Sequence, residues 1–540
     1  MMRQSVTYIF SFWFCLAIGF QSIAQESIFT GLKGDYKKAD AYYQNHEYHN
    51  AIVIYKQILE KDPNNTPLIL DLANSYFFTN NMENASRWYR EFDKRNGQLT
   101  SAEELRFASS LHSSGNYQEA IVRLQRYQER YPADVEISKK IWQLQNVHFL
   151  MEDSLSYHIE RLPINSSSDE SGPLLYGNSL VFISNRDDVS LIKRVDARNG
   201  SQYYSWYASK IINQGSTADE ELVYGKSLPF AAQIKSKYHK GSISFNDARD
   251  VMIYSKVIGN VVDGEITSKL FFAEKIDSKW SESISFALNN ENYSIQYPFL
   301  TNNGKRIYFS SNMPGGFGGM DLYYADFIKD AWSKPINLGK EINTSQNEGH
   351  PFVYGSILYF SSDGHPGLGG LDLFHVNLDQ KPLEVINAGY PVNTFHDDFN
   401  LILDESGTAG YFCSNREHAL YGGDDIYSIQ FKKLTFPLRV SGKISFKKID
   451  LVDNGEALIK LSNASIELID KDSEEIVYES KTDISGNFEI DIPYESKFLL
   501  KVKQPELGIA IVSMEIPKNH RDYLNHDIVI VQDLFNITPK

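Results

Sequence analysis

The stretch Ser310–Phe327, SSNMPGGFGGMDLYYADF, places four glycines within five residues directly before an acidic, aromatic segment. Two later stretches repeat its pattern of two glycines, an acidic residue, an apolar residue and an aromatic residue: SSDGHPGLGGLDLFHV and SNREHALYGGDDIYSI. The acidic residues of the three copies are 51 and 53 residues apart and are Asp321, Asp372 and Asp425. A pattern that recurs in this way indicates a repeated architecture rather than one specialised loop.

Each copy follows a short alternating segment, RIYFSS, ILYFSS or GYFCS, that predicts a β-strand. Two weaker copies lie upstream, in DESGPLLYGNSLVFISNRDD and HKGSISFNDARDVMIYSK, and each precedes a segment rich in Tyr and Phe. Five units of about 40 to 60 residues, each with four short strands, are typical of a β-propeller. We predict five blades; a sixth would fit between Ile212 and Tyr238 or could be completed by terminal strands.

The glycines are interpreted as turn residues, because glycine reaches positive φ without a steric penalty. The Asp after each turn is expected to accept backbone N–H groups and to begin the next strand. A phosphate loop would need Gly-Lys-Ser/Thr before a helix, and a dinucleotide fingerprint would open a helix. Both NGKRIY and GGFGGMD open strands instead, so we predict no nucleotide site and no cofactor.

Residues 33–150 contain little Pro or Gly and place apolar residues at helical spacing. Alanines recur after 34 and 35 residues, each with a second alanine twelve residues earlier: Ala51, Ala85 and Ala120 after Ala39, Ala73 and Ala108. This period predicts tetratricopeptide repeats, followed by a capping helix over residues 134–150. Such an array binds a protein segment in its concave groove, or it serves as a spacer or dimerisation element.

The residues after 436 alternate cleanly over three predicted strands in NASIELIDKDSEEIVYESKTDISGNFEIDIP. TDISGNFEI resembles the carboxypeptidase-regulatory-like β-sandwich domain, whose T-D-x-x-G-x-F signature falls on Thr482, Asp483, Gly486 and Phe488. A generic immunoglobulin-like sandwich is the alternative. Both folds are adhesive or spacer modules without catalytic activity.

The N-terminus predicts an export signal over residues 1–24. Arg3 precedes the apolar run IFSFWFCLAIGF, and Ser22 and Ala24 have the spacing of a cleavage site after Ala24. An uncleaved anchor is the alternative, and no later run approaches membrane length. Cys15 lies in this signal, which leaves Cys413 alone in the mature chain, without an intrachain disulfide and expected to be buried in a strand.

Net charge and motifs restrict the function. A charge of -16 without a basic patch argues against nucleic acid as a partner. No G-x-S-x-G elbow, H-E-x-x-H helix or EF-hand loop is present. The acidic pair Asp397 and Asp398 could serve acid–base chemistry, although solvated carboxylates are far commoner. Four histidines could meet at one rim and bind metal, or be repeat-associated loop residues: His350, His365, His396 and His418. We predict no catalytic, cofactor or metal residues, leave the binding residues unassigned, and expect no enzyme.

The order of modules resembles the multidomain OmpA-family periplasmic proteins of Bacteroidetes, which include a component of the type IX secretion and gliding machinery. The modules are a signal peptide (1–24), a tetratricopeptide domain (30–152), a TolB-like or WD40-like β-propeller (160–434) and a regulatory-like sandwich (436–535). The resemblance implies a periplasmic protein that is peripheral to the outer membrane and binds outer-membrane or secretion-system proteins. Members usually continue into an OmpA-like domain that grips peptidoglycan, and this sequence ends where such a domain would begin.

The leading expectation is therefore a non-enzymatic scaffold or adaptor for envelope proteins, linked to type IX secretion or outer-membrane organisation. The first alternative is a protein that binds glycans or peptidoglycan fragments on a propeller rim with Tyr, Trp and Asp. The second is a propeller glycosidase or lyase, which needs convergent acids at one end of the channel. Fold alone does not decide among them.

Overall fold

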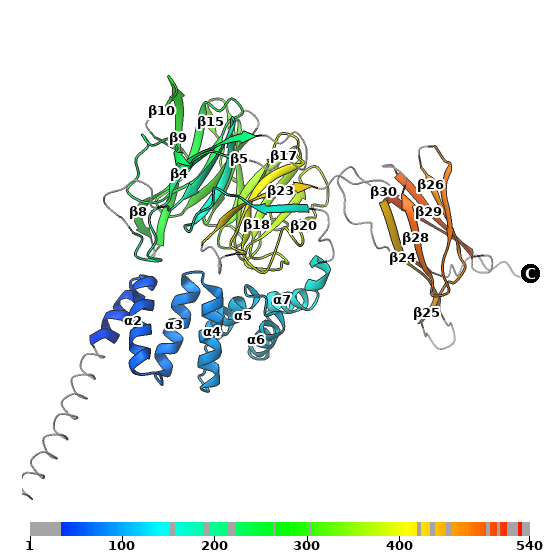
Figure 1. The fold of residues 1–540 in the computed structure, drawn as a ribbon, viewed down its shortest axis with the longest axis horizontal. Coiled ribbons are helices and arrows are strands. Elements are labelled where there is room, and N and C mark those ends of the chain that lie inside the picture. The colour runs from blue at the N-terminus through cyan, green and yellow to red at the C-terminus, as the bar shows by residue number, and fades with distance from the viewer. Residues whose placement is uncertain are drawn as a thin grey trace, which may run out of the picture. The chain divides into compact units, whose positions relative to one another are not determined.

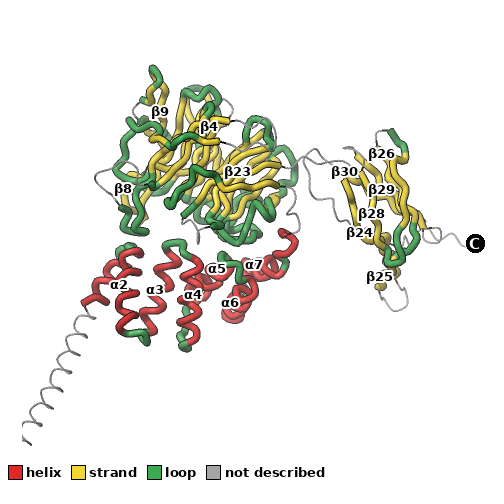
Figure 2. The backbone as a smooth tube through the Cα atoms, in the orientation of Figure 1, coloured by secondary structure: helices red, strands yellow, loops and turns green. Residues whose placement is uncertain are grey.

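The computed structural model describes residues 34–151, 157–186, 195–213, 223–262, 265–281, 283–301, 304–417, 423–431, 438–449, 456–471, 473–492, 497–504, 508–515 and 528–531. The chain divides into one unit that ends at Gln430 and a second that begins at Phe431. The first unit contains helices followed by five sheets, and the second contains strands (Figure 1; Figure 2). The predicted signal peptide lies outside the described residues.

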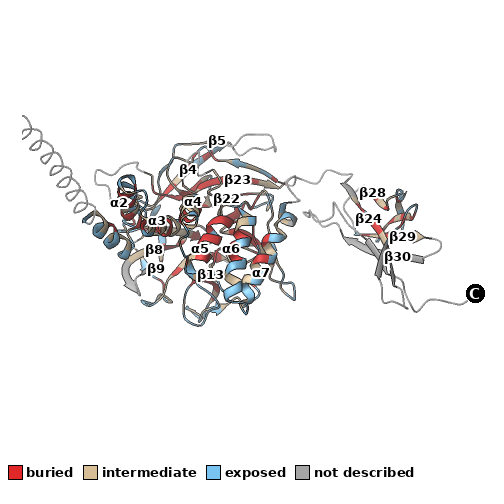
Figure 3. Cartoon of the chain, turned by 90° about the horizontal axis from the view of Figure 1, so that it is seen from below, coloured by how far each residue is buried: buried red, intermediate tan, exposed pale blue. Residues whose placement is uncertain are grey.

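The N-terminal region consists of paired helices. A helix over residues 34–44 precedes α2 (Tyr48–Lys61). Then α3 (Thr66–Phe78) pairs with α4 (Met82–Lys94), and α5 (Ser101–His112) pairs with α6 (Tyr117–Arg130). α7 (Val135–Gln145) and the 3-10 helix η1 (Val147–Met151) follow. The repeated alanines are all buried, as the sequence predicts, because small side chains let paired helices approach closely. Buried positions run along α5 and α6 in Figure 3.

Side-chain caps fix where these helices begin. Asn81 accepts a hydrogen bond from the N–H of Asn84 at the start of α4. Thr100 and Glu103 form a reciprocal capping box at the start of α5. α2 ends at Lys61, two residues before Pro63, which cannot continue a helix.

Five antiparallel sheets follow. The first sheet contains β2 (Glu170–Tyr176), β3 (Ser179–Ser184), β4 (Ser205–Asn213), β5 (Val223–Tyr224) and β6 (Leu228–Pro229). The second sheet contains β7 (Lys240–Phe245), β8 (Val251–Val262), β9 (Glu265–Ile276), β10 (Lys279–Trp280) and β11 (Ile284–Ser285). The third contains β12 (Ile295–Thr301), β13 (Arg306–Ser311), β14 (Asp321–Ile328), β15 (Ala331–Trp332) and β16 (Ile336–Asn337). The fourth contains β17 (Glu348–Tyr354), β18 (Ile357–Ser362), β19 (Asp372–Asn377) and β20 (Val385–Asn387), and the fifth β21 (Asp398–Leu403), β22 (Ala409–Ser414), β23 (Asp425–Phe431) and β1 (Tyr157–Arg161).

The sheets follow one another in a propeller-like order. Their first strands β2, β7, β12, β17 and β21 are neighbours in that sequence, and β21 is also a neighbour of β2. The terminal strand β1 pairs with β23 and so completes the fifth sheet. The described residues between Ile212 and Tyr238 supply only β5 and β6, which extend the first sheet, so that segment adds no further sheet in the described part.

The glycine-rich stretch forms the loop between β13 and β14, and only part of the prediction for it is confirmed. Asp321 accepts the N–H groups of Phe317 (2.6 Å) and Gly318 (2.9 Å) and begins β14, which confirms the role expected for it. Of the four glycines, however, only Gly315 has positive φ, at 94°. A Cβ on Gly318 would lie 2.5 Å from the carbonyl oxygen of Thr344, so this glycine permits close approach to the chain leading into the next sheet.

The second unit pairs β24 (Leu438–Ile449) with β25 (Glu456–Lys460), β28 (Asn487–Ile492) and β31 (Ile528–Val531). Its other sheet contains β26 (Ser465–Asp470), β27 (Ile476–Lys481), β29 (Lys497–Gln504) and β30 (Gly508–Glu515). In the T-D-x-x-G-x-F stretch, Thr482 Oγ1 donates to the carbonyl of Leu461 (2.6 Å), Gly486 has a φ of 80°, and Phe488 is buried. These residues therefore hold a turn against the core of this unit.

Within the described part of the chain, no helix has both the length and the apolar character needed to cross a membrane.

Candidate functional site

The helix pairs contact the propeller-like region through the turns inside each pair. Asn80, between α3 and α4, donates to a carboxylate oxygen of Asp397 (2.7 Å). Tyr117, at the start of α6, donates its hydroxyl to the carbonyl of Leu368 (2.8 Å), in the glycine-rich loop of the fourth sheet. Leu368 is 1 % exposed, so this loop is packed rather than free.

A chamber of about 700 Å³ lies between the helices and the sheets. The wall from α3, α5, α7 and the α3–α4 turn includes Asn80, Arg106, Ser109, His112, Lys140 and Gln143. The opposite wall comes from the third, fourth and fifth sheets and includes Gln296, Tyr297, Gln346, Asn347, Asp363 and Asp397. This volume falls within the range of small-molecule sites, and the convergent amide and carboxylate groups could orient a polar ligand.

Pairs of Asn and Asp side chains form the rim of the propeller wall. Asp363 accepts both the backbone N–H (2.8 Å) and the side-chain amide (3.1 Å) of Asn347. Asp397 accepts the side-chain amide of Asn415 (3.2 Å), while its own backbone N–H donates to the side-chain oxygen of Asn415 (3.0 Å). Asp169 and Asn185 of the first sheet pair as Asp397 and Asn415 do. Because two strands contribute to each pair, the rim groups are held in fixed positions.

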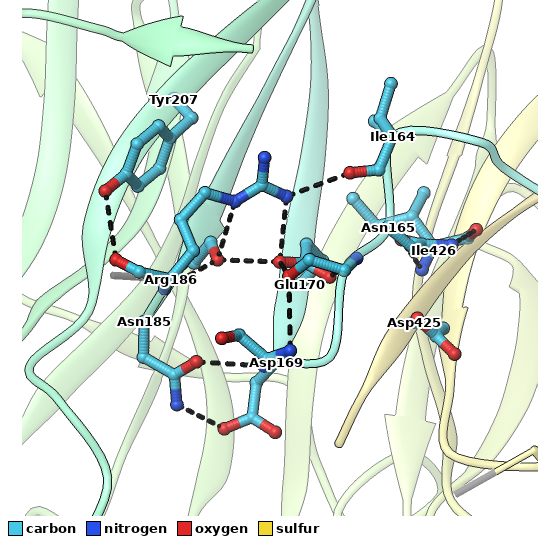
Figure 4. Close-up of polar contacts among 12 residues, drawn as sticks. Ile164, Asn165, Asp169, Glu170, Asn185, Arg186, Tyr207, Asp425 and Ile426 are labelled. Atoms are coloured by element: carbon cyan, nitrogen blue, oxygen red, sulfur yellow. Dashed lines mark hydrogen bonds and ion pairs between the residues drawn. The ribbon is translucent and has the colours of Figure 1, made fainter. Parts of the chain in front are cut away.

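Buried carboxylates at the start of the first strand hold three of the sheets in place through hydrogen bonds to neighbouring segments. Glu170 begins β2 with no exposed surface and accepts hydrogen bonds from the N–H and hydroxyl of Ser166 (2.7 Å each) and from the Ser184 hydroxyl (2.8 Å). Figure 4 shows Arg186 completing this set through an ion pair of 2.8 Å to Glu170. The guanidinium of Arg186 also lies 5.0 Å from the ring centre of Phe182.

The same arrangement recurs at β21 and, without an arginine, at β17. Asp398 accepts from the hydroxyl of Thr394 (2.8 Å) and pairs with Arg416 (2.6 Å). Glu348 accepts from the N–H and hydroxyl of Thr344 and from Ser362, and burial raises the pKa of Glu348. These carboxylates are engaged by the chain itself, so they hold the site in shape rather than supply free acids to it.

Tyr297 and His350 lie where the chamber meets the central channel lined by the first strands of the sheets. Their ring centres are 3.9 Å apart, and their φ angles are 54° and 52°. A bulky residue in this conformation is uncommon and strained, which makes the position a candidate for function. His350 Nδ1 is buried without a hydrogen-bond partner in the described structure, and burial lowers the pKa of His350 to about 3.

The structure places the described histidines and the acidic pair singled out in the sequence in different surroundings. His350 lies in strand β17 rather than in a loop, and His365 bonds the carbonyl of Ile342 (2.8 Å). His396 lies between Asn393 and Asp398, while His418 is outside the described residues. Asp398 is buried with Arg416, whereas Asp397 lines the chamber. Where residues are described, no group of three or more His, Cys, Asp or Glu could hold a metal ion.

Cys413 lies in β22 with no exposed surface, as predicted. Burial raises the pKa of its thiol. It therefore behaves as a small core residue.

Sequence reasoning missed the buried carboxylates and the rim pairs. A signal was available, because a hydroxyl residue stands four positions before each carboxylate: Ser166 before Glu170, Thr344 before Glu348, and Thr394 before Asp398. The chamber residues of α5 and α7 gave no such signal. Their role depends on which helix face meets the sheets.

The tetratricopeptide repeat family matches residues 42–102, which confirms the repeat prediction for that segment. No curated protein matches this sequence. Among solved structures, a thermostable family-43 glycoside hydrolase is 13 % identical, with 55 % of this chain and 95 % of that chain covered and a TM-score of 0.32. The Bombyx mori GH32 β-fructofuranosidase is 11 % identical, with 70 % and 93 % covered and a TM-score of 0.31.

The expectation that this chain is not an enzyme is corrected by these comparisons, because the matching structures are mostly glycoside hydrolases. The tricorn protease is also among them, with 11 % identity, 65 % of this chain and 35 % of that chain covered, and a TM-score of 0.26. Likenesses of this size identify no reaction and no catalytic residue. These comparisons therefore do not decide whether the chamber catalyses a reaction.

Proposed function

We propose that the chamber between the helical repeats and the propeller binds a glycan or peptidoglycan fragment. The observation that carries this proposal is a cavity of about 700 Å³ whose walls present planar amide and carboxylate groups from both sides. Sugar hydroxyls donate and accept at once, so paired amides and carboxylates suit them. The rim pairs Asn347–Asp363 and Asn415–Asp397 are held before any ligand arrives, which reduces the entropy lost on binding.

The contacts between the helices and the sheets favour a compact ligand over a long peptide. Leu368 is buried, and its carbonyl is bound by Tyr117. The loop therefore closes one side of the space beside α5 and α6. A small oligosaccharide fits within the remaining volume without displacing this contact.

The test is a glycan array probed with the chain in wild-type and chamber-blocked forms. Ser109 is exposed and lines the chamber, so Ser109→Trp fills it without disturbing the core. Ala102→Trp is the matched control, because Ala102 is exposed on the same helix but does not line the chamber. We expect Ser109→Trp to abolish retention and Ala102→Trp to leave it unchanged. Equal retention by both variants would place glycan binding elsewhere, and no retention by the wild type would refute the proposal.

The same glycan array assay also distinguishes binding from hydrolysis. Mass spectrometry of the recovered glycan shows whether a glycosidic bond has been cleaved during the assay. An intact ligand supports a binding protein, and cleavage that Ser109→Trp abolishes supports a glycosidase or lyase at the chamber.

A second candidate is a scaffold for envelope proteins, which the tetratricopeptide match over residues 42–102 favours. Trp142 on α7 is 63 % exposed and Val135 is 62 % exposed, and solvent-facing apolar groups of this size suit a protein contact. Affinity purification from a native envelope would test it. Recovery of the same envelope proteins by wild type and Trp142→Ala would count against a role for this surface.

We also propose a more specific architecture and location for this chain. The five sheets and their cyclic order support a five-bladed, TolB-like propeller, and the Thr482–Phe488 turn supports a regulatory-like sandwich. The sequence features of an export signal support a periplasmic location beside the outer membrane, with relatives among the OmpA-family proteins. Sequencing the N-terminus of the exported protein would test cleavage after Ala24.

A further inference from the structure

The charged groups that line the chamber differ in how completely the chain satisfies them. Its carboxylates all have donors: Glu136 pairs with Lys139 (2.8 Å), and Glu348, Asp363 and Asp397 accept N–H or O–H groups. Two cations on the helical wall do not have a carboxylate partner among the described ion pairs. They are Arg106 on α5 and Lys140 on α7.

Arg106 already contacts uncharged groups of the helical repeats. Its guanidinium donates to the side-chain oxygen of Asn74 (2.5 Å) and lies 5.2 Å from the ring centre of Phe78. Lys140 has no such contact in the described structure, although it is partly buried. Lys140 is therefore the cation with the most unused binding capacity in the chamber.

The surroundings of Lys140 leave its charge only partly compensated. Asp372 on β19 and Asp363 on the rim act on it at longer range, and His112 on α5 also lies near it. Burial lowers the pKa of Lys140, because removing an ammonium from water disfavours its charge. A partly buried charge without a hydrogen-bonded partner is unfavourable for the fold, and an anion that binds it relieves that penalty.

We infer that Lys140 binds a carboxylate of the chamber ligand, which makes that ligand an acidic saccharide. This inference rests on the proposed glycan function and specifies its substrate class. The amide-rich rim would contact the hydroxyls of the sugar, and the Lys140 ammonium would bind its acid group. The negatively charged carboxylate of Asp363 sits on the opposite wall, so the acid group must lie toward α7 to avoid repulsion.

Lys139 supplies a matched control on the same helix. It also lines the chamber, but it is exposed and already paired with Glu136, so its loss removes one charge from α7 without removing the unpaired cation. Both Lys140→Gln and Lys139→Gln keep a long polar side chain. Their difference therefore isolates the position of the charge.

The experiment uses a glycan array on which each acidic oligosaccharide stands beside its carboxyl-reduced, neutral counterpart. We expect the full-length wild type to retain the acidic member about tenfold or more over the reduced member, the effect of one charge-assisted hydrogen bond. Lys140→Gln should bind both members equally weakly, and Lys139→Gln should behave like the wild type.

The outcomes separate this inference from the function on which it rests. Equal wild-type binding to acidic and reduced members, or equal loss in both variants, overturns the role of Lys140 but leaves a glycan site. No binding to any member refutes the glycan site and the inference together. Thermal unfolding excludes a folding defect, because removing an uncompensated charge should leave the Tm of Lys140→Gln unchanged or higher.

Discussion

Replacing Glu170 by Gln removes the negative charge that pairs with Arg186 inside the first sheet. Glu170 has no exposed surface, and the side chain of Arg186 is only 11 % exposed, so water can replace little of the lost interaction. The carboxylate also accepts from Ser166 and Ser184, and a Gln side chain offers one acceptor oxygen in place of two.

Removing one partner of a buried ion pair costs about 3 to 5 kcal/mol, because the other charge is left uncompensated. Glu348→Gln is the matched comparison, since Glu348 occupies the same place in the fourth sheet but is bonded by Thr344 and Ser362 without an arginine. Its replacement exchanges hydrogen bonds to a carboxyl group for hydrogen bonds to an amide and leaves no cation uncompensated, so it should cost only about 1 kcal/mol.

Thermal unfolding followed by calorimetry measures both changes. For a unit of this size, the Glu170→Gln variant should unfold roughly 4 to 6 °C below the wild type, and the Glu348→Gln variant about 1 °C below it. Adding Arg186→Met to Glu170→Gln should recover part of the loss, because it removes the unpaired charge. Equal losses for the two single variants, or no recovery in the double variant, would refute the reasoning that charge neutralisation fixes this strand.

Three further predictions concern the loop, the channel and the junction. Gly318→Ala should lower the Tm, because its Cβ would press on the carbonyl oxygen of Gln346. The first unit should lose stability as pH falls from about 6.5 towards 3. Burial lowers the pKa of His350 to about 3, so in this range the histidine is protonated in the unfolded chain but stays neutral in the folded one. Unfolding curves recorded at a series of pH values should show a weaker pH dependence for His350→Gln. Tyr117→Phe removes the hydrogen bond that joins α6 to the carbonyl of Leu368 and should speed amide hydrogen exchange in α5 and α6 about fivefold.

The sequence predicted the repeated elements well, because their signals are local. Alanines at a period of 34 or 35 residues place small side chains where paired helices touch, and the structure buries all of them. Asp321 could be assigned to the start of a strand because the backbone N–H groups that donate to its carboxylate lie within four residues of it. Gly318 could not be explained in the same way, since the atoms that exclude a side chain there belong to residues 344 and 346.

The candidate site could not be predicted from local patterns. Lys140 and Asp363 lie more than 200 residues apart in the chain and meet at one chamber only because the helix turns contact the sheets. The four histidines share a blade-like spacing, yet His350 lies inside β17, at the bulge where the pairing with β18 shifts register. Such placements follow from tertiary packing, which a spacing argument does not contain.

We propose that a glycan binds between the helical repeats and the propeller-like sheets. Photo-crosslinking with a glycan retained on the array, followed by mass spectrometry of the digested protein, locates that contact directly. We expect crosslinks in α7 around Lys140 and in the rim segment that includes Asn347, and we expect Ser109→Trp to abolish them. Crosslinks confined to the unit that begins at Phe431, or unchanged by Ser109→Trp, would contradict it.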